Sequence, residues 1–210
     1  MKRFWRLFPL ALAAWLVTGG VWLSGLRWLD GGSAGLAQAQ SSDLESKKIV
    51  PFVPTPQEVV ERMLELAQVK KGDVVYDLGS GDGRIVITAA KKYGVKAVGF
   101  EIDPELLQKS RETIRKEGLE RLAEIREQDI LTVDLSPASV VTMYLLPEVN
   151  LKLRPAVLRQ LKPGSRVVSH DFDMGDWKPL KVEHIKDPSG WDHTIYLWRI
   201  EKKSGSRDYR

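Results

Sequence analysis

The sequence contains no cysteine among its 210 residues. This absence excludes disulfide bonds, a thiol nucleophile, cysteine-ligated zinc and iron–sulfur clusters. Hydrophobic residues make up 43% and charged residues 29% of the chain, a composition that excludes wholesale disorder. The length is sufficient for one well-buried domain.

A surplus of positive charge is also absent from most of the chain. The formal net charge is +4, and most of it comes from four basic residues and one acid within residues 1–40. Residues 41–210 hold 28 basic and 27 acidic side chains. A protein held to nucleic acid mainly through phosphate contacts needs a cationic face, so we expect no nucleic-acid partner.

Charge is missing altogether from residues 7–26. Twenty apolar residues in a helix match the thickness of a bilayer, which predicts membrane contact through this run. Two interpretations stay open for residues 1–29. The length favours an uncleaved single-helix anchor, whereas the basic start and the Ala37-Gln38-Ala39 pattern are typical of a signal peptide cleaved near Ala39, followed by export. The basic residues ahead of the run predict a cytoplasmic N-terminus, with the following domain on the other side of the membrane.

After a small, polar segment at residues 30–49, expected to be a flexible linker, apolar strand-like and helix-like segments alternate. We expect a helix with Pro56 at its first position, capped by Thr55. The predicted strands are 74–78, 97–102, 124–128, 140–146, 166–170, 180–185 and 194–200, and the later predicted helices are 84–93, 104–117 and 148–161. This order predicts an α/β fold with a doubly wound, mostly parallel seven-stranded sheet and an antiparallel edge strand, preceded by an N-terminal apolar helix. The domain is expected to span residues 50–203, with a disordered tail at 204–210.

Glycines gather between the first predicted strand and the next helix, in the segment Asp77-Leu78-Gly79-Ser80-Gly81-Asp82-Gly83. Glycines at such a turn let the backbone approach a ligand closely. Arg84 stands where a dinucleotide fingerprint requires glycine, and no G-K-[S/T] follows, so neither a dinucleotide loop nor a P-loop is predicted. Asp77 would repel phosphate and attract an ammonium or sulfonium group.

Two further acids follow the next strands. Glu101 ends the second predicted strand, where a carboxylate can accept the two hydroxyls of a ribose. Asp129 follows the third strand, where a side chain can reach an adenine edge. Asp103 next to Pro104 is interpreted as a helix cap.

These residues resemble the class I S-adenosylmethionine-dependent methyltransferases, which have a Rossmann-like seven-stranded sheet. More narrowly, the segments VPFVPTP, YDLGSGDGRIVI, GFEID, VTMYLLPEVN and LKPGSRVVSHDFDMGDW resemble the lysine methyltransferases that act on the ATP synthase c-subunit and the adenine nucleotide translocase, together with their bacterial relatives. The resemblance implies S-adenosylmethionine as cofactor, with Asp77, Gly79, Ser80, Gly81, Gly83, Glu101 and Asp129 around it. It also implies that the methyl acceptor is a lysine amine of a protein. Because residues 7–26 of this chain predict membrane contact, we expect that acceptor protein to be membrane-associated. That cofactor is made in the cytosol, which conflicts with the predicted export, so the side of the membrane stays open.

The acceptor site is expected beyond the carboxyl ends of the fourth and fifth predicted strands. Tyr144, Asp171 and His170 are the catalytic candidates: Asp171 or Asp173 to hold the ammonium, and His170 to pass a proton to water. The expected substrate-binding residues are Pro147, Phe172, Asp173 and Trp177, with aromatic walls for the methylated product.

His170, Asp171 and Asp173, together with His184 and His193, also have the composition of a metal site. No zinc-type spacing such as H-E-x-x-H is present, so no metal is expected. Two other functions stay open, namely methylation of a small membrane-associated metabolite and a non-catalytic cofactor-binding module. Among the possible acceptors nucleic acid ranks third, behind a lysine and a small molecule, because the end of the fourth strand lacks the N/D-P-P-[FYW] tetrapeptide.

Overall fold

A computed structural model describes residues 52–202. The expected N-terminal apolar helix, the linker and the C-terminal tail lie outside the described residues. Within residues 52–202, no helix is long and apolar enough to cross a membrane.

Seven strands form one sheet in the order β3-β2-β1-β4-β5-β7-β6. The five strands β1 to β5 are parallel, whereas β7 pairs antiparallel with both β5 and β6. The described elements are α2 (Gln57–Leu66), β1 (Val74–Leu78), α3 (Arg84–Tyr93), β2 (Lys96–Glu101), α4 (Pro104–Lys116), β3 (Ala123–Glu127), η1 (Ile130–Thr132), β4 (Val140–Met143), α5 (Pro147–Gln160), β5 (Arg166–His170), β6 (Lys181–Lys186) and β7 (Asp192–Arg199). The predicted doubly wound sheet with an antiparallel edge is therefore confirmed.

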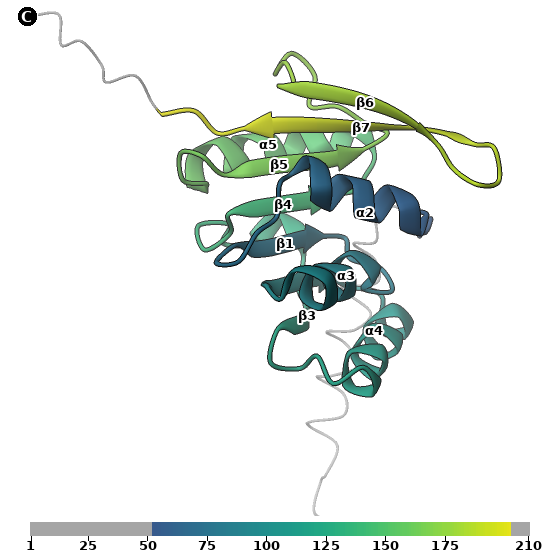
Figure 1. Ribbon diagram of the computed structural model, residues 1–210. Helices are drawn as coiled ribbons and strands as arrows, with labels where there is room; N and C mark the ends of the chain where they lie inside the picture. Colours follow the sequence, from purple (N-terminus) through teal and green to yellow (C-terminus); the bar gives the residue numbers. More distant parts are fainter. Residues whose placement is uncertain (1–51, 203–210) are drawn as a thin grey trace, which may run out of the picture.

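Helices cover both faces of the sheet, and each face has its own apolar core (Figure 1). One core joins α2, α3 and α4 to alternate strand residues such as Val75 and Ala97. The other joins α5 to residues of the opposite face, among them Leu78 and Phe100. Side chains of a strand alternate between faces, so a continuous apolar strand supplies both cores.

Two local predictions are corrected. The strand expected at 140–146 ends at Met143 because the chain turns into α5, which leaves Tyr144 in the connecting loop. Thr55 was expected to cap the first helix, but Pro56 precedes α2 and no side chain caps it. The hydroxyl of Thr55 lies instead 3.2 Å from His170 Nδ1. The Asp103 cap is confirmed, since its side chain accepts hydrogen bonds from the Glu105 and Leu106 amides.

Candidate functional site

The glycine-rich segment forms a tight turn at the carboxyl end of β1. Gly79, Gly81 and Gly83 have φ angles of 75°, 55° and 79°, in the left-handed region that glycine enters at little cost. Gly83 is the N-cap of α3, and a Cβ at Gly81 would lie 2.4 Å from the ring of Phe52. The turn therefore depends on glycine both for its backbone angles and for the close approach of Phe52.

The Glu101 carboxylate holds this turn in place. Its Oε2 accepts a hydrogen bond from the Gly81 amide at 2.7 Å. Its Oε1 accepts from the amides of Ile102 and Asp103 at 2.8 and 3.0 Å. Each carboxylate oxygen thus has a backbone partner, and the side chain links the end of β2 to the loop after β1.

The Asp77 carboxylate is almost fully buried, and Thr142 Oγ1 donates to its Oδ1 at 2.8 Å. Burial raises the pKa of Asp77 to about 7, the Thr142 hydrogen bond opposes this, and the nearby Glu101 and Asp82 charges add to it. Within the described part of the chain, no basic side chain forms an ion pair with Asp77. A cationic ligand beside this carboxylate would supply the missing positive charge.

One cavity brings together most of the residues that the sequence assigned to the cofactor. Its lining includes Asp77, Gly79, Ser80, Gly81, Glu101, Asp129 and Tyr144. Gly83 does not line the cavity; it precedes α3 as its N-cap residue. Asp129 Oδ1 accepts from the Leu131 amide at 2.9 Å and so begins η1 beside the cavity.

Sequence reasoning missed several residues around this cavity. Phe52, Val53 and Thr55, from the segment ahead of α2, contribute to the wall. Gly99 on β2 is a second missed requirement, because a Cβ there would lie 2.5 Å from Ser80 Oγ. The position of Gly99 in the middle of an apolar strand could have indicated this requirement, since a glycine in a strand often marks a place where another segment approaches the backbone closely.

The catalytic candidates lie together at the carboxyl ends of β4 and β5. The Tyr144 hydroxyl donates to Asp171 Oδ2 at 3.3 Å, and the Tyr144 ring is 3.9 Å from the His170 ring, between centroids. Burial, and then the negative charge of Asp171, raise the pKa of Tyr144. Tyr144 also lines the cofactor cavity, so it connects that cavity to the Asp171 cluster.

Asp171 has a positive φ of 59°, which is uncommon for a residue other than glycine. Its backbone amide donates to the Thr194 carbonyl at 2.7 Å, and the Thr194 amide donates to Asp171 Oδ1 at 2.8 Å. These two bonds to β7 hold the strained residue in place and fix the direction of its carboxylate. Such strain is commonly retained at functional sites.

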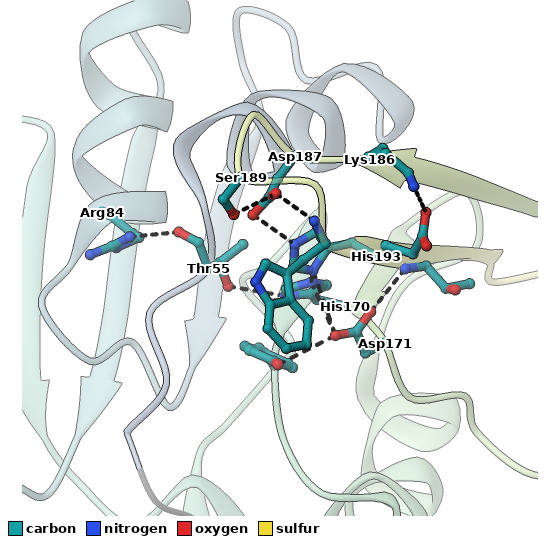
Figure 2. A network of polar contacts seen from close by, with 12 residues as sticks. Thr55, Arg84, His170, Asp171, Lys186, Asp187, Ser189 and His193 are labelled. Carbon is teal, nitrogen blue, oxygen red and sulfur yellow. Dashed lines mark hydrogen bonds and ion pairs between the residues drawn. The ribbon is translucent and has the colours of Figure 1, made fainter.

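His170 is completely buried, and burial lowers its pKa to about 4. The expectation that it passes a proton directly to water is therefore corrected, because the imidazole is neutral at neutral pH and does not reach solvent. Its Nε2 lies 2.9 Å from His193 Nδ1, and His193 Nε2 lies 3.4 Å from Asp187 Oδ2 (Figure 2). The pairing of β5 with β7 brings His193 next to His170. The two histidines are 23 residues apart in the chain, a separation that gave no indication of this contact.

The four expected substrate-binding residues lie in different places. Phe172 stacks near Tyr144, with ring centroids 6.3 Å apart, and Asp173 is an exposed turn residue that accepts from the Gly175 amide. Pro147 begins α5. Trp177 is partly buried against the core beside β7, where its ring packs on Trp198 and its carbonyl accepts from the Trp198 indole at 2.7 Å. The role of Trp177 in substrate binding stays a prediction.

Chemically, the site joins a cavity suited to a cationic nucleoside with an aromatic and acidic cluster suited to an amine. Buried Asp77 fits the positive charge of S-adenosylmethionine. Glu101 and Asp129 line the same cavity, where carboxylate oxygens that already accept from backbone amides keep further lone pairs for polar groups of the nucleoside. His170, Asp171 and His193 also bring three possible metal ligand atoms within 4.8 Å of one another.

Residues 77–181 match the family model described as the ANTKMT methyltransferase domain. The chain is 50% identical over 152 residues to a protein-lysine N-methyltransferase of Saccharolobus islandicus, which covers 72% of this chain and 94% of that protein. It is 37% identical over 157 residues to the human lysine N-methyltransferase that is named for the ATP synthase c-subunit, covering 75% of this chain and 66% of the human protein.

Among solved structures, the chain is similar to one from Salinibacter ruber that is titled an RNA methyltransferase in complex with S-adenosyl-L-homocysteine. The two are 54% identical, with a TM-score of 0.67, over 72% of this chain and 95% of that one. The described relatives therefore agree on methyl transfer and differ in the acceptor that their names give.

Proposed function

Because this chain belongs to the ANTKMT methyltransferase family, we propose that it transfers a methyl group from S-adenosylmethionine to a lysine amine of a protein. The chain is an S-adenosylmethionine-dependent methyltransferase, and the acceptor is the part that we propose. The observation that carries the proposal is the partly buried cluster of Tyr144, Asp171 and Phe172 beside the cofactor cavity.

The charge of this cluster favours an amine over a nucleic-acid phosphate. Asp171 and Asp173 follow β5, and Asp187 approaches His193 from the hairpin between β6 and β7. Lysine methylation is also the activity in the names of the Saccharolobus and human relatives. An acidic rim attracts an ammonium group and repels phosphate.

RNA is the second candidate acceptor, because the Salinibacter structure of 54% identity is titled an RNA methyltransferase. Two features of this chain argue for the protein acceptor instead. The turn after β4 reads Tyr144-Leu145-Leu146-Pro147 and lacks the N/D-P-P-[FYW] tetrapeptide. Residues 41–210 carry almost no net charge.

In the proposed mechanism the protein orients the lysine nitrogen in line with the reactive methyl group. The cofactor supplies an electrophilic methyl group on a sulfonium, with a neutral thioether as leaving group. Asp171 fixes the rotation of the Tyr144 hydroxyl by accepting a hydrogen bond from it, so the oxygen lone pairs of Tyr144 remain available to an N–H of the lysine. The rings of Tyr144 and Phe172 shield the nitrogen from water.

The lysine ammonium must lose a proton before its nitrogen can attack. Shifting a pKa of about 10.4 to near 7 corresponds to about 4–5 kcal/mol. Desolvation against the aromatic rings contributes to this shift. Asp171, whose side chain is 26% exposed, is positioned to pass the released proton to solvent.

The acceptor is tested by incubating the full chain in detergent with labelled S-adenosylmethionine, membrane proteins and, separately, total RNA. We expect label in protein, recovered as methyllysine after acid hydrolysis. Label in RNA would support the second candidate, label in lipid or small molecules would favour the metabolite alternative, and no turnover despite cofactor binding would favour a non-catalytic module.

The location of the enzyme is a further part of the proposal. We propose that residues 7–26 anchor the chain to a membrane, so that the protein acceptor is membrane-associated. The length of this uncharged run supports an anchor over a cleaved signal. A reporter fused at residue 45 tests which side of the membrane the domain occupies, and an N-terminus beginning after Ala39 would overturn the anchor.

Replacement of Asp171 by asparagine is expected to lower kcat for lysine methylation about 100-fold, with little change in the affinity for S-adenosylhomocysteine. The physical reason is the loss of the negative charge that orients Tyr144 and attracts the ammonium. The matched control is Asp192→Asn at the start of β7, whose side chain is 80% exposed. Equal activity of the two variants would exclude a catalytic role for Asp171.

A further inference from the structure

We propose that His170, His193 and Asp171 form a binding site for one divalent transition-metal ion of the Zn²⁺ type. The sequence did not predict this site, because the two histidines are far apart in the chain and match no zinc motif. The antiparallel pairing of β5 and β7 brings them together, with His170 opposite Ile195.

The distances between the three donor atoms match those of a metal centre. His170 Nε2 lies 2.9 Å from His193 Nδ1 and 3.3 Å from Asp171 Oδ2, and His193 Nδ1 lies 3.8 Å from the same oxygen. With metal–ligand bonds of about 2.0–2.1 Å, tetrahedral ligands are about 3.3 Å apart. The triangle therefore has the size that a single ion requires.

The outer partners of both imidazoles support the same assignment. His170 Nδ1 lies 3.2 Å from the Thr55 hydroxyl, and His193 Nε2 lies 3.4 Å from the Asp187 carboxylate (Figure 2). Histidines that bind metals commonly use their second nitrogen in this way, which directs the first nitrogen at the ion. The Thr194 amide donates to Asp171 Oδ1, whereas Oδ2, which accepts from the Tyr144 hydroxyl, lies on the side of the histidines.

The ligand set indicates the type of ion. Two imidazoles and one carboxylate suit Zn²⁺ and its neighbours in the first transition series better than Mg²⁺ or Ca²⁺, which prefer oxygen ligands. Three protein ligands leave a coordination position open, as in zinc enzymes of the two-histidine, one-carboxylate type. An ion next to Tyr144 would favour a neutral lysine amine over the ammonium, an effect that rests on the proposed function.

The test uses the full chain with no affinity tag, dialysed against a chelator and titrated with Zn²⁺ by calorimetry and with Co²⁺ by visible absorption. We expect one ion per chain, a Co²⁺ spectrum of tetrahedral nitrogen and oxygen ligation, and a rise in Tm of about 5 °C with excess Zn²⁺. His193→Asn and Asp171→Asn should each weaken binding at least tenfold. Circular dichroism and binding of S-adenosylhomocysteine check that these variants fold.

His184 supplies the matched control, because it is the one histidine of the three in the sequence that is not part of the proposed site, and it lies on β6. His184→Asn should bind the ions as the unsubstituted protein does. Absence of binding up to about 100 µM Zn²⁺, or equal binding by His193→Asn, would overturn the site and leave the two imidazoles as a pair that shares a proton. Binding is measured without acceptor, so this outcome is independent of whether lysine is methylated.

Discussion

Replacement of Glu101 by glutamine is expected to weaken cofactor binding by about 100- to 1,000-fold, although the two side chains have nearly the same shape. Both oxygens of Glu101 accept hydrogen bonds from backbone amides, Oε2 from Gly81 and Oε1 from Ile102 and Asp103. Glutamine has one acceptor oxygen, so its NH₂ group must replace the other oxygen and point at a backbone N–H, where two donors face each other. Glu101 and Gly81 both line the cofactor cavity, so the change disturbs the binding site itself. An unsatisfied, partly buried donor and a lost charge-assisted bond cost about 3–4 kcal/mol together, and each 1.4 kcal/mol is a factor of ten in affinity.

Calorimetry with S-adenosylhomocysteine measures this effect. Glu105→Gln is the matched control, because Glu105 lies exposed in the first turn of α4 and its side chain has no role in the loop. Affinity of Glu101→Gln within a factor of three of the control would show that the carboxylate does not organise the cofactor site.

Replacement of Asp77 by asparagine is expected to have opposite effects on binding and on stability. Affinity for S-adenosylmethionine should fall about 100-fold, because the buried charge facing the cationic ligand is removed. The free energy of unfolding at pH 8 should rise, because asparagine has no ionised form to bury and can still accept the Thr142 hydrogen bond.

The pH dependence of the unfolding free energy tests whether the charge of Asp77 causes the difference in stability. The pKa of Asp77 is raised from 3.8 to about 7 in the folded protein, so the stabilising contribution of the protonated form is complete below pH 4 and is lost as the pH rises to 7. The gap in unfolding free energy between Asp77→Asn and the unsubstituted protein should therefore grow by roughly 2–3 kcal/mol between pH 5 and pH 8. Urea unfolding at several pH values measures this gap, and a constant gap would contradict the assignment.

Cofactor affinity should show the same titration. Ionised Asp77 is the form that attracts a cation, so affinity of the unsubstituted protein should fall about tenfold from pH 8 to pH 6 because of Asp77. The amino group of the ligand titrates in the same pH range, and comparison with Asp77→Asn removes its contribution. Parallel pH profiles for the two proteins would exclude Asp77 as the ligand's counter-charge.

Local sequence patterns predicted the elements of the sheet with small errors in their ends. The strand at 166–170 was placed without error, and the cap at Asp103 was identified correctly. These elements were predictable because apolar periodicity and capping act over a few residues. The fourth strand was predicted too long, because the apolar residues after Met143 enter a loop and then α5 without any change in hydrophobicity.

The cofactor side of the site was also largely readable from the sequence. The glycine loop, Glu101 and Asp129 each follow a predicted strand, and the carboxyl ends of parallel strands meet at one edge of a sheet. Phe52 and Gly99 were missed because their importance lies in close approaches to Gly81 and Ser80. Such approaches depend on how separate segments pack.

The sequence alone determined the chemistry that was available: no thiols, a glycine turn after the first strand, acids at the strand ends and an aromatic-acidic segment after the fifth. The tertiary structure alone decided which of these groups meet. It packed Trp177 on Trp198, buried His170, placed Thr55 beside that histidine instead of at a helix cap, and brought His193 to Asp171. The physical reason is that local preferences depend on neighbouring residues, whereas burial and distances between strands depend on the register in which distant segments pair.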